Sequence, residues 1–267
     1  MKAGRRINNI FFGICIFCSC APLVLLILLT VGMSWPYPSL LPRVFSLRYF
    51  QYVFGDLQTL KAVITSILLA GFVTLLTLAI AVPAARSLAL YKYRGKWLVE
   101  LLVLAPLVVP AIAVSSGIQV TMIRLALSGS FLGVTLIHTV FALPYAIRIM
   151  TGVFEIISDR YEQQATVLGA GAAMTFFRVT LPMIMPGLLS AAAISFTISL
   201  SQYITTFLIG GGRIITVSML LIPYIRSGQV QTAAVYSAML IAAAMFSLFL
   251  MERAVRRFYN LETVVFI

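Results

Sequence analysis

The residues best suited to chemistry on another molecule lie in one polar segment, residues 158–182, between two long apolar runs. It reads SDRYEQQATVLGAGAAMTFFRVTLP. Asp159 and Glu162 suit the positive end of a helix dipole, and Gly169 allows a backbone geometry closed to other residues. We therefore expect a short amphipathic helix near 159–168, a turn at Gly169 and a second segment over 172–178. Such a helix either docks onto another protein or simply connects two spans at the membrane surface.

Two ionisable residues fall within apolar runs. His138 could relay a proton or hold a ligand, because intramembrane ionisable groups are candidates for function. No acidic residue lies near it in the sequence, which favours a packed, hydrogen-bonding role. Glu100 follows Lys96 by four residues, a spacing at which opposite charges pair on one helix face.

Cys15, Cys18 and Cys20 lie within the first apolar run. Thiols in such a helix act as small hydrophobic side chains, and no second cluster completes a metal site or a disulfide framework. The sequence also lacks the G-x-x-x-x-G-K-[ST] phosphate loop and the H-E-x-x-H and G-x-S-x-G motifs. We expect neither ATP hydrolysis nor another enzymatic activity from this chain, and no cofactor or metal bound to it.

The elements that position these residues are membrane helices. Of the 267 residues, 61% are hydrophobic and 10% charged, whereas soluble domains have about 25% charged residues. This composition predicts a single all-α integral membrane domain over 1–267. A helix of about 20 residues crosses the ~30 Å hydrocarbon core. Six apolar segments qualify, near 10–34, 60–84, 98–122, 131–154, 183–207 and 232–251, with the loop 155–182 between the fourth and fifth.

The basic residues give the orientation. The net charge of +12 comes from short clusters beside apolar runs, which mark topology and contact anionic lipid headgroups rather than nucleic acid. With six spans, thirteen Lys and Arg residues fall on the side of the termini and the 155–182 loop, and six on the other. Because cytoplasmic loops are enriched in Lys and Arg, both termini and the polar segment are predicted to be cytoplasmic.

Breaks and polar side chains within the spans indicate a pathway. Pro106 and Pro110 are expected to break the third span, and Pro144 to interrupt the fourth. A short apolar segment over 216–225 is expected to form a partial helix on the outer face or a re-entrant piece that could act as a gate. The fifth span is unusually polar. The candidate pathway residues are Ser195, Ser199, Gln202 and Thr206 from this span, together with His138.

The polar segment resembles the cytoplasmic loop of permease subunits of bacterial ABC importers, which have the MetI-like type I fold. The loop signature is E-A-A-x-x-x-G, then nine residues, then I-x-L-P. With Gly169 as the anchor, residues 179–182 fit the second part as V-T-L-P, and Ala165 fits the second alanine. Gln163 and Gln164 take the Glu and first Ala places, and Glu162 lies one position early.

This resemblance implies that the loop helix docks in a groove of a cytoplasmic ATP-binding subunit and couples it to the spans. The implied partners are two ATP-binding cassette subunits that carry ATP and Mg, a second permease subunit, identical or related, and a periplasmic substrate-binding protein. The implied location is the bacterial inner membrane. The implied coupling residues are Glu162, Gln163, Ala165, Gly169, Phe176, Leu181 and Pro182.

Residues 39–54 resemble the first outer loop of the polyamine, ferric iron and phosphonate branch of these permeases. That branch often carries acidic residues at the end of the fifth span, where this chain has Ser201 and Gln202. The difference disfavours a cationic polyamine and leaves the solute open. The alternative function is an ion-coupled secondary transporter, for which only Glu100 and His138 are candidate relay groups. An intramembrane enzyme is disfavoured, because paired catalytic groups are missing.

Overall fold

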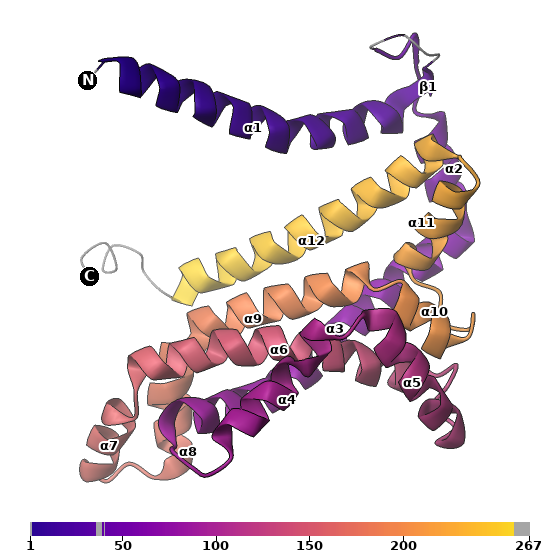
Figure 1. Ribbon diagram of the computed structural model, residues 1–267. Coiled ribbons are helices and arrows are strands. Elements are labelled where there is room, and N and C mark those ends of the chain that lie inside the picture. The colour runs from indigo at the N-terminus through magenta and orange to yellow at the C-terminus, as the bar shows by residue number, and fades with distance from the viewer. Residues whose placement is uncertain (1, 36–38, 40, 259–267) are drawn as a thin grey trace. The chain divides into compact units, whose positions relative to one another are not determined.

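The computed structural model describes residues 2–35, 39 and 41–258 (Figure 1). Its contacts divide the chain into two compact units. The first comprises residues 1–61 and 220–242, and the second residues 62–219 and 243–267. Each unit is described separately below.

The first unit opens with the long helix α1, Lys2–Val31, followed by the strands β1, Gly32–Ser34, and β2, Val44–Phe45. The strands pair antiparallel, and the short helix α2, Arg48–Gly55, follows them. Apart from this two-stranded ladder, the described elements are helical, as the composition predicts. Cys15, Cys18 and Cys20 are free and exposed on α1.

The other elements of this unit are joined by a helix cap, a contact between two hydroxyl groups and a pair of stacked rings. The helix α3, Leu57–Leu90, begins after Asp56, whose carboxylate accepts a hydrogen bond from the Gln58 amide at 3.0 Å. This is the capping that exposed amides at a helix start require. Within α12, Val230–Phe258, the Tyr236 hydroxyl lies 2.7 Å from the Thr59 hydroxyl. The ring of Tyr236 also stacks on Tyr224 of α11, Val217–Arg226, with centroids 5.5 Å apart.

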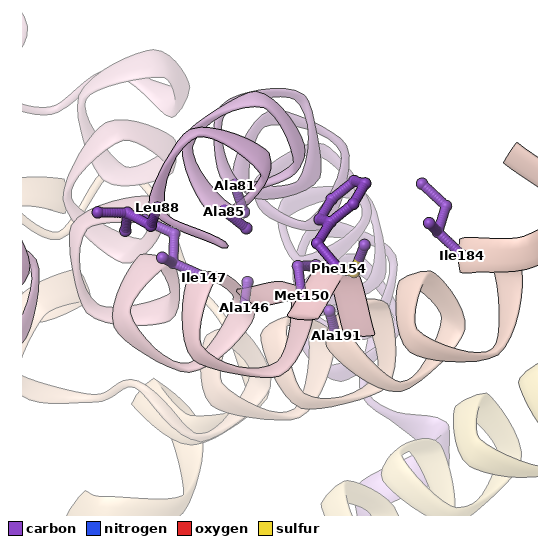
Figure 2. Close-up of a cluster of buried hydrophobic side chains, with 9 residues drawn as sticks. All are labelled: Ala81, Ala85, Leu88, Ala146, Ile147, Met150, Phe154, Ile184 and Ala191. Atoms are coloured by element: carbon purple, nitrogen blue, oxygen red, sulfur yellow. The ribbon is translucent and has the colours of Figure 1, made fainter. Parts of the chain in front are cut away.

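The second unit is built on two helices that lie side by side, α6, Phe131–Ile157, and α9, Leu181–Ser201 (Figure 1). Their pairing with α3 buries a core of small and large apolar side chains (Figure 2). The core residues are Ala81, Ala85, Leu88, Ala146, Ile147, Met150, Phe154, Ile184 and Ala191. Small residues allow membrane helices to approach closely. The resulting van der Waals packing holds the helices together in lipid, where the hydrophobic effect does not drive their association.

Gly187 marks a very close approach between α9 and α6. A Cβ atom added there would lie 2.4 Å from Val153 Cγ2, 3.3 Å from Val153 Cβ and 3.4 Å from Val153 Cγ1. All three distances are at or below the limit of ordinary carbon contacts. The packing of α9 on α6 therefore depends on the absence of a side chain at Gly187.

The third predicted span is broken rather than straight. It consists of α4, Lys96–Val108, and α5, Ala111–Arg124, bent by 105°. The break falls at Val109 and Pro110. Val109 is extended, because a residue before proline is driven out of the helical region. Pro106 does not break α4, and Pro144 does not interrupt α6, so these two expectations were wrong. The turns around each proline keep the helix continuous, as is common in packed membrane helices.

The fifth span was predicted to run to residue 207, but α9 ends at Ser201. Gln202 is extended, and a separate helix, α10, Ile204–Gly210, follows. Neither proline nor glycine lies at this break. The partial helix expected over 216–225 is present as α11 and contains Pro223.

Five of the described helices are long and apolar enough to cross a membrane, and the bent pair α4–α5 adds a sixth if it counts as one span. Whether α4–α5 counts as one span depends on where the chain enters and leaves this pair. Leu90 and Tyr91, where α3 ends, line the same cavity as Asp159 beyond the C-terminal end of α6. At the other end of α6, the Gly129 amide donates to the Ile209 carbonyl of α10 at 2.7 Å. The bent pair therefore connects the two ends of α6.

Candidate functional site: an exposed loop helix and a broken span

The polar segment contains the short helix α7, Arg160–Val167, close to the predicted bounds. Gly169 ends it with a φ of +85°, so the predicted turn at this glycine is confirmed. The Gly169 amide donates to the Thr166 carbonyl and the Ala170 amide to the Ala165 carbonyl, both at 3.0 Å. This is the Schellman arrangement, whose left-handed residue is usually glycine because other residues pay a steric cost there.

The outer face of α7 presents amide and apolar side chains to solvent. Gln163 and Gln164 are exposed, and Val167 and Leu168 are 87% and 88% exposed. Ala165 is half-buried. Two adjacent and strongly exposed apolar side chains therefore lie at the C-terminal end of this polar helix.

Glu162 points the other way. Its Oε2 forms an ion pair with Arg86 near the end of α3, and its Oε1 accepts a hydrogen bond from Thr180 Oγ1 at 2.6 Å. An open cavity of about 480 Å³ beside this contact is lined by Arg86, Leu90, Tyr91, Asp159, Glu162, Gln163, Thr166 and Val167. Sequence reasoning placed Glu162 among the docking residues. Nothing in the sequence indicated its contact with Arg86, 76 residues away.

Between α7 and α9, the chain forms α8, Ala172–Thr175, and a π-helical turn, Phe176–Thr180. The Leu181 amide donates to the Phe176 carbonyl, five residues back. Phe176 and Leu181 line an apolar cavity of about 450 Å³ together with residues of α3 and α6. Pro182 is exposed near the start of α9. The polar segment thus enters the fifth span without a loop.

A second cluster surrounds the break between α9 and α10. His138 of α6 is fully buried, with Nδ1 3.0 Å from Ser199 Oγ and Nε2 3.0 Å from Thr206 Oγ1. The Thr206 hydroxyl donates its single proton to the Gln202 carbonyl at 2.8 Å. Nε2 is therefore the protonated nitrogen, and Nδ1 accepts from Ser199. His138 bridges the break by holding one residue on each side of it.

Further contacts satisfy the backbone at this break. The Gln202 carbonyl also accepts from Ser218 Oγ at 3.0 Å, and at the start of α11 the Ser66 hydroxyl accepts from the Val217 amide at 2.9 Å. Non-helical backbone at membrane depth is tolerated only where such partners or water are available. The residues predicted for the pathway differ in burial and in position. Gln202 is half-buried, whereas Ser199, Thr206 and His138 are buried around the break, and Ser195 is buried elsewhere on α9 with its hydroxyl bonded to the Ala191 carbonyl.

The two ionisable residues, His138 and Glu100, both have contacts with neighbouring side chains. Both nitrogens of His138 face hydroxyl groups, and no carboxylate contacts it among the described residues. Lys96 Nζ lies 3.9 Å from Glu100 Oε1, so the predicted pair on one helix face is confirmed.

The family to which the chain belongs is identified by a match over most of its length. Residues 78–260 match the family described as "Binding-protein-dependent transport system inner membrane component". The chain belongs to this family of permeases. It is the membrane component of an ABC importer and spans the inner membrane several times.

Curated permeases of two kinds are among the relatives. The spermidine/putrescine permease PotC of Haemophilus influenzae is 27% identical over 182 residues, covering 67% of each chain. The molybdenum permease ModB of Mycobacterium bovis is 31% identical over 166 residues, covering 57% of this chain and 62% of its own length. The putrescine permease PotI of Escherichia coli K12 is 26% identical, covering 75% of this chain and 70% of its own. The matches thus span between three fifths and seven tenths of these relatives. The polyamine permeases agree with the expected branch, whereas the sequence reasoning did not name molybdate permeases.

The fold agrees over nearly the whole length. A bacterial ABC transporter involved in the import of the polysaccharide alginate superposes with a TM-score of 0.71, 15% identity and 97% of both chains covered. A structure of the alginate transporter in complex with an alginate-pentasaccharide-bound periplasmic protein gives a TM-score of 0.65 at 14% identity. At these identities, the likeness concerns the fold alone.

The buried histidine of the permease gives a testable prediction. We expect His138→Leu to lower the melting temperature of the purified permease in detergent by several degrees. It removes two hydrogen bonds, each worth up to about 1.7 kcal/mol between membrane helices, and leaves the helix break without its bridge. Thr139→Val is the matched control, because the Thr139 hydroxyl bonds only within its own helix. An equal shift in both variants would contradict the bridging role.

Proposed function

We propose that this permease forms one half of the translocation pathway for a small hydrophilic solute and switches its access when ATP binds to partner subunits. The chain has no phosphate loop of its own, so ATP and Mg belong on two ATP-binding cassette subunits. The other proposed partners are a second permease subunit, identical or related, and a periplasmic substrate-binding protein. No enzymatic activity is assigned to this chain.

The observation that carries the proposal is the exposed tip of α7. Val167 and Leu168 are exposed apolar residues at the end of a short polar helix whose other face is tied to the spans. We assign docking onto the ATP-binding subunit to the exposed face, including Gln163 and Gly169. Phe176, Leu181 and Pro182 then carry the movement of the docked helix into α9, because the chain continues as a helix from residue 172 to residue 201.

The proposed topology has six spans with both termini and α7 in the cytoplasm. The charge excess of thirteen Lys and Arg against six supports this orientation. It also requires that the bent pair α4–α5 crosses the membrane once, which agrees with its path between the two ends of α6. A re-entrant α4–α5 would put α7 on the opposite side from Lys92 and Arg94.

We assign the pathway wall to the break after α9, where Gln202 is half-buried and Ser201 is exposed. Ser199, Thr206 and His138 support this wall from behind, and Ser195 contributes to the same polar helix. Residues 181–210 contain no Asp, Glu, Lys or Arg. A wall with hydroxyl and amide groups alone suits a solute that is recognised by hydrogen bonds, and it lacks the carboxylate that a polycation would favour.

Energisation of uptake tests the proposed function. Cells that produce the permease with its partners are given labelled spermidine, putrescine or molybdate, the solutes named for its relatives. We expect the accumulated label to stop rising when ATP is depleted and to keep rising when a protonophore collapses the proton gradient at constant ATP. Uptake that ends with the proton gradient would instead support ion-coupled transport. Uptake of a polyamine would contradict the inference from the uncharged wall that the solute is not a polycation.

A further inference from the structure

Glu162 is held within the fold by two side-chain contacts. Its side chain is 19% exposed, and both carboxylate oxygens are occupied, one by Arg86 and the other by Thr180. Gln163, at the position where the family pattern has its glutamate, is exposed and donates to Asp159 at 2.6 Å. One residue along an α-helix corresponds to a rotation of about 100°. The displaced acid thus lies on the inner face of α7.

The contacts of Glu162 join three elements. Arg86 lies one turn before the end of α3, and Thr180 is the buried last residue of the π-helical turn that leads into α9. The backbone connections of α7 are less direct. Ser158, which joins it to α6, is non-helical with a φ of +55°, and Gly169 turns the chain away at its other end. The Glu162 side chain is therefore a direct link from α7 to two spans.

Arg86 depends on this link. Its Nε is buried without a hydrogen-bond partner among the described residues, and the ion pair with Glu162 is the contact that its guanidinium makes there. Neutralising Glu162 would leave a cation at the end of α3 with no acid to hold it. The contact to Thr180, in contrast, needs only an acceptor oxygen, which glutamine also provides.

We propose that Glu162 is a positioning residue that transmits the movement of the docked α7 to α3 and α9 through Arg86 and Thr180, and that it makes no contact with the ATP-binding subunit. This inference rests on the proposed function. It assigns docking to the exposed amide and apolar face of α7 and transmission to the opposite, acidic face.

The test uses the complete transporter and a reporter that needs no transported solute. Cys15, Cys18 and Cys20 are replaced by alanine, and Ser201→Cys places a thiol at the exposed end of α9. Its rate of labelling by N-ethylmaleimide is measured with and without ATP and Mg in membrane vesicles. Co-purification of the ATP-binding subunit is measured in parallel. Glu162→Gln is compared with Glu155→Gln, an exposed acid at the end of α6.

We expect Glu162→Gln to retain the ATP-binding subunit and to reduce the ATP-dependent change in labelling rate at least tenfold, with Glu155→Gln unchanged. The double variant Glu162→Gln/Gln163→Glu moves the charge to the outer face, and we expect it to remain defective. Thr180→Val breaks the second contact without touching the charge. It should reduce the response in the same direction, and it decides the question if Glu162→Gln does not insert.

Three results would overturn the inference: a normal response in Glu162→Gln, restoration by the double variant, or loss of the ATP-binding subunit from Glu162→Gln. The last two would identify the carboxylate as a docking group. Failure of the proposed function gives a different result, because the parent protein with Glu162 intact would then show no bound ATP-binding subunit or no response to ATP.

Discussion

Replacing Gly169 with valine is expected to reduce uptake at least tenfold. The residue has a φ of +85°, and the space around a new Cβ is empty, so the cost lies in the backbone and not in a clash. A left-handed conformation costs an ordinary L-residue about 1–2 kcal/mol, and more with a β-branched side chain. About 1.4 kcal/mol already corresponds to a tenfold change in the population of a conformation. The altered turn would move Val167 and Leu168 out of the position that we propose for docking.

Two substitutions separate this backbone effect from general damage to the loop. Gly169→Asn should retain most of the uptake, because asparagine tolerates the left-handed region best after glycine. Gly171→Ala should be neutral, since Gly171 has a φ of −70° and open space at the Cβ position. Uptake of the accepted solute and retention of the ATP-binding subunit are measured for all three. Equal loss in the asparagine and valine variants would argue against the Schellman turn as the cause.

A methyl group at Gly187 is expected to destabilise the permease itself. Its Cβ would lie 2.4 Å from Val153 Cγ2, and rotating the valine does not help, because Val153 Cβ lies within 3.3 Å as well. Overpacking of this kind costs about 1–3 kcal/mol. For a chain of this size, Gly187→Ala should lower the melting temperature in detergent by several degrees, and Gly187→Leu by more.

A second substitution at the contacted residue is expected to compensate for the clash. Val153→Ala in the Gly187→Ala background should recover most of the lost stability, since it removes Val153 Cγ2 and Cγ1 and leaves only the Cβ contact at 3.3 Å. Gly152→Ala on α6 has open space at its Cβ position and should be neutral or stabilising, because alanine has the higher helix propensity. If Gly152→Ala and Gly187→Ala were equally harmful, the α6–α9 approach would not be the reason.

What could be predicted from the sequence is mostly what local chemistry decides. The helix ending at Gly169 follows from capping, and the break before α5 follows from Pro110. The partial helix α11 follows from its apolar length. The long apolar runs likewise predict α1, α6 and α12, because crossing the bilayer requires about 20 residues whatever the neighbours are.

The contacts that depend on distant residues could not be predicted. The break at Gln202 has no proline or glycine to mark it, and its stability depends on His138, 61 and 68 residues from its two partners. The hydroxyl-rich end of the fifth span was the one available sign. The inward orientation of Glu162 likewise depends on Arg86. A one-residue displacement of the acid is a small change in the sequence, although it rotates the side chain by about 100° around the helix.

The π-helical turn at Phe176–Thr180 has a consequence for sequence change in this region. Its bond from Leu181 to Phe176 spans one residue more than an α-helical turn does. Deleting a single residue there would restore ordinary α-helix, and the segment before it would keep nearly its present rotation about the axis of α9, because the wider turn holds about one residue more for the same rotation. The turn thus absorbs one extra residue without altering how α9 is rotated relative to the segment before it, whereas Phe176 and Thr180 within the turn are constrained by the apolar cavity and by Glu162.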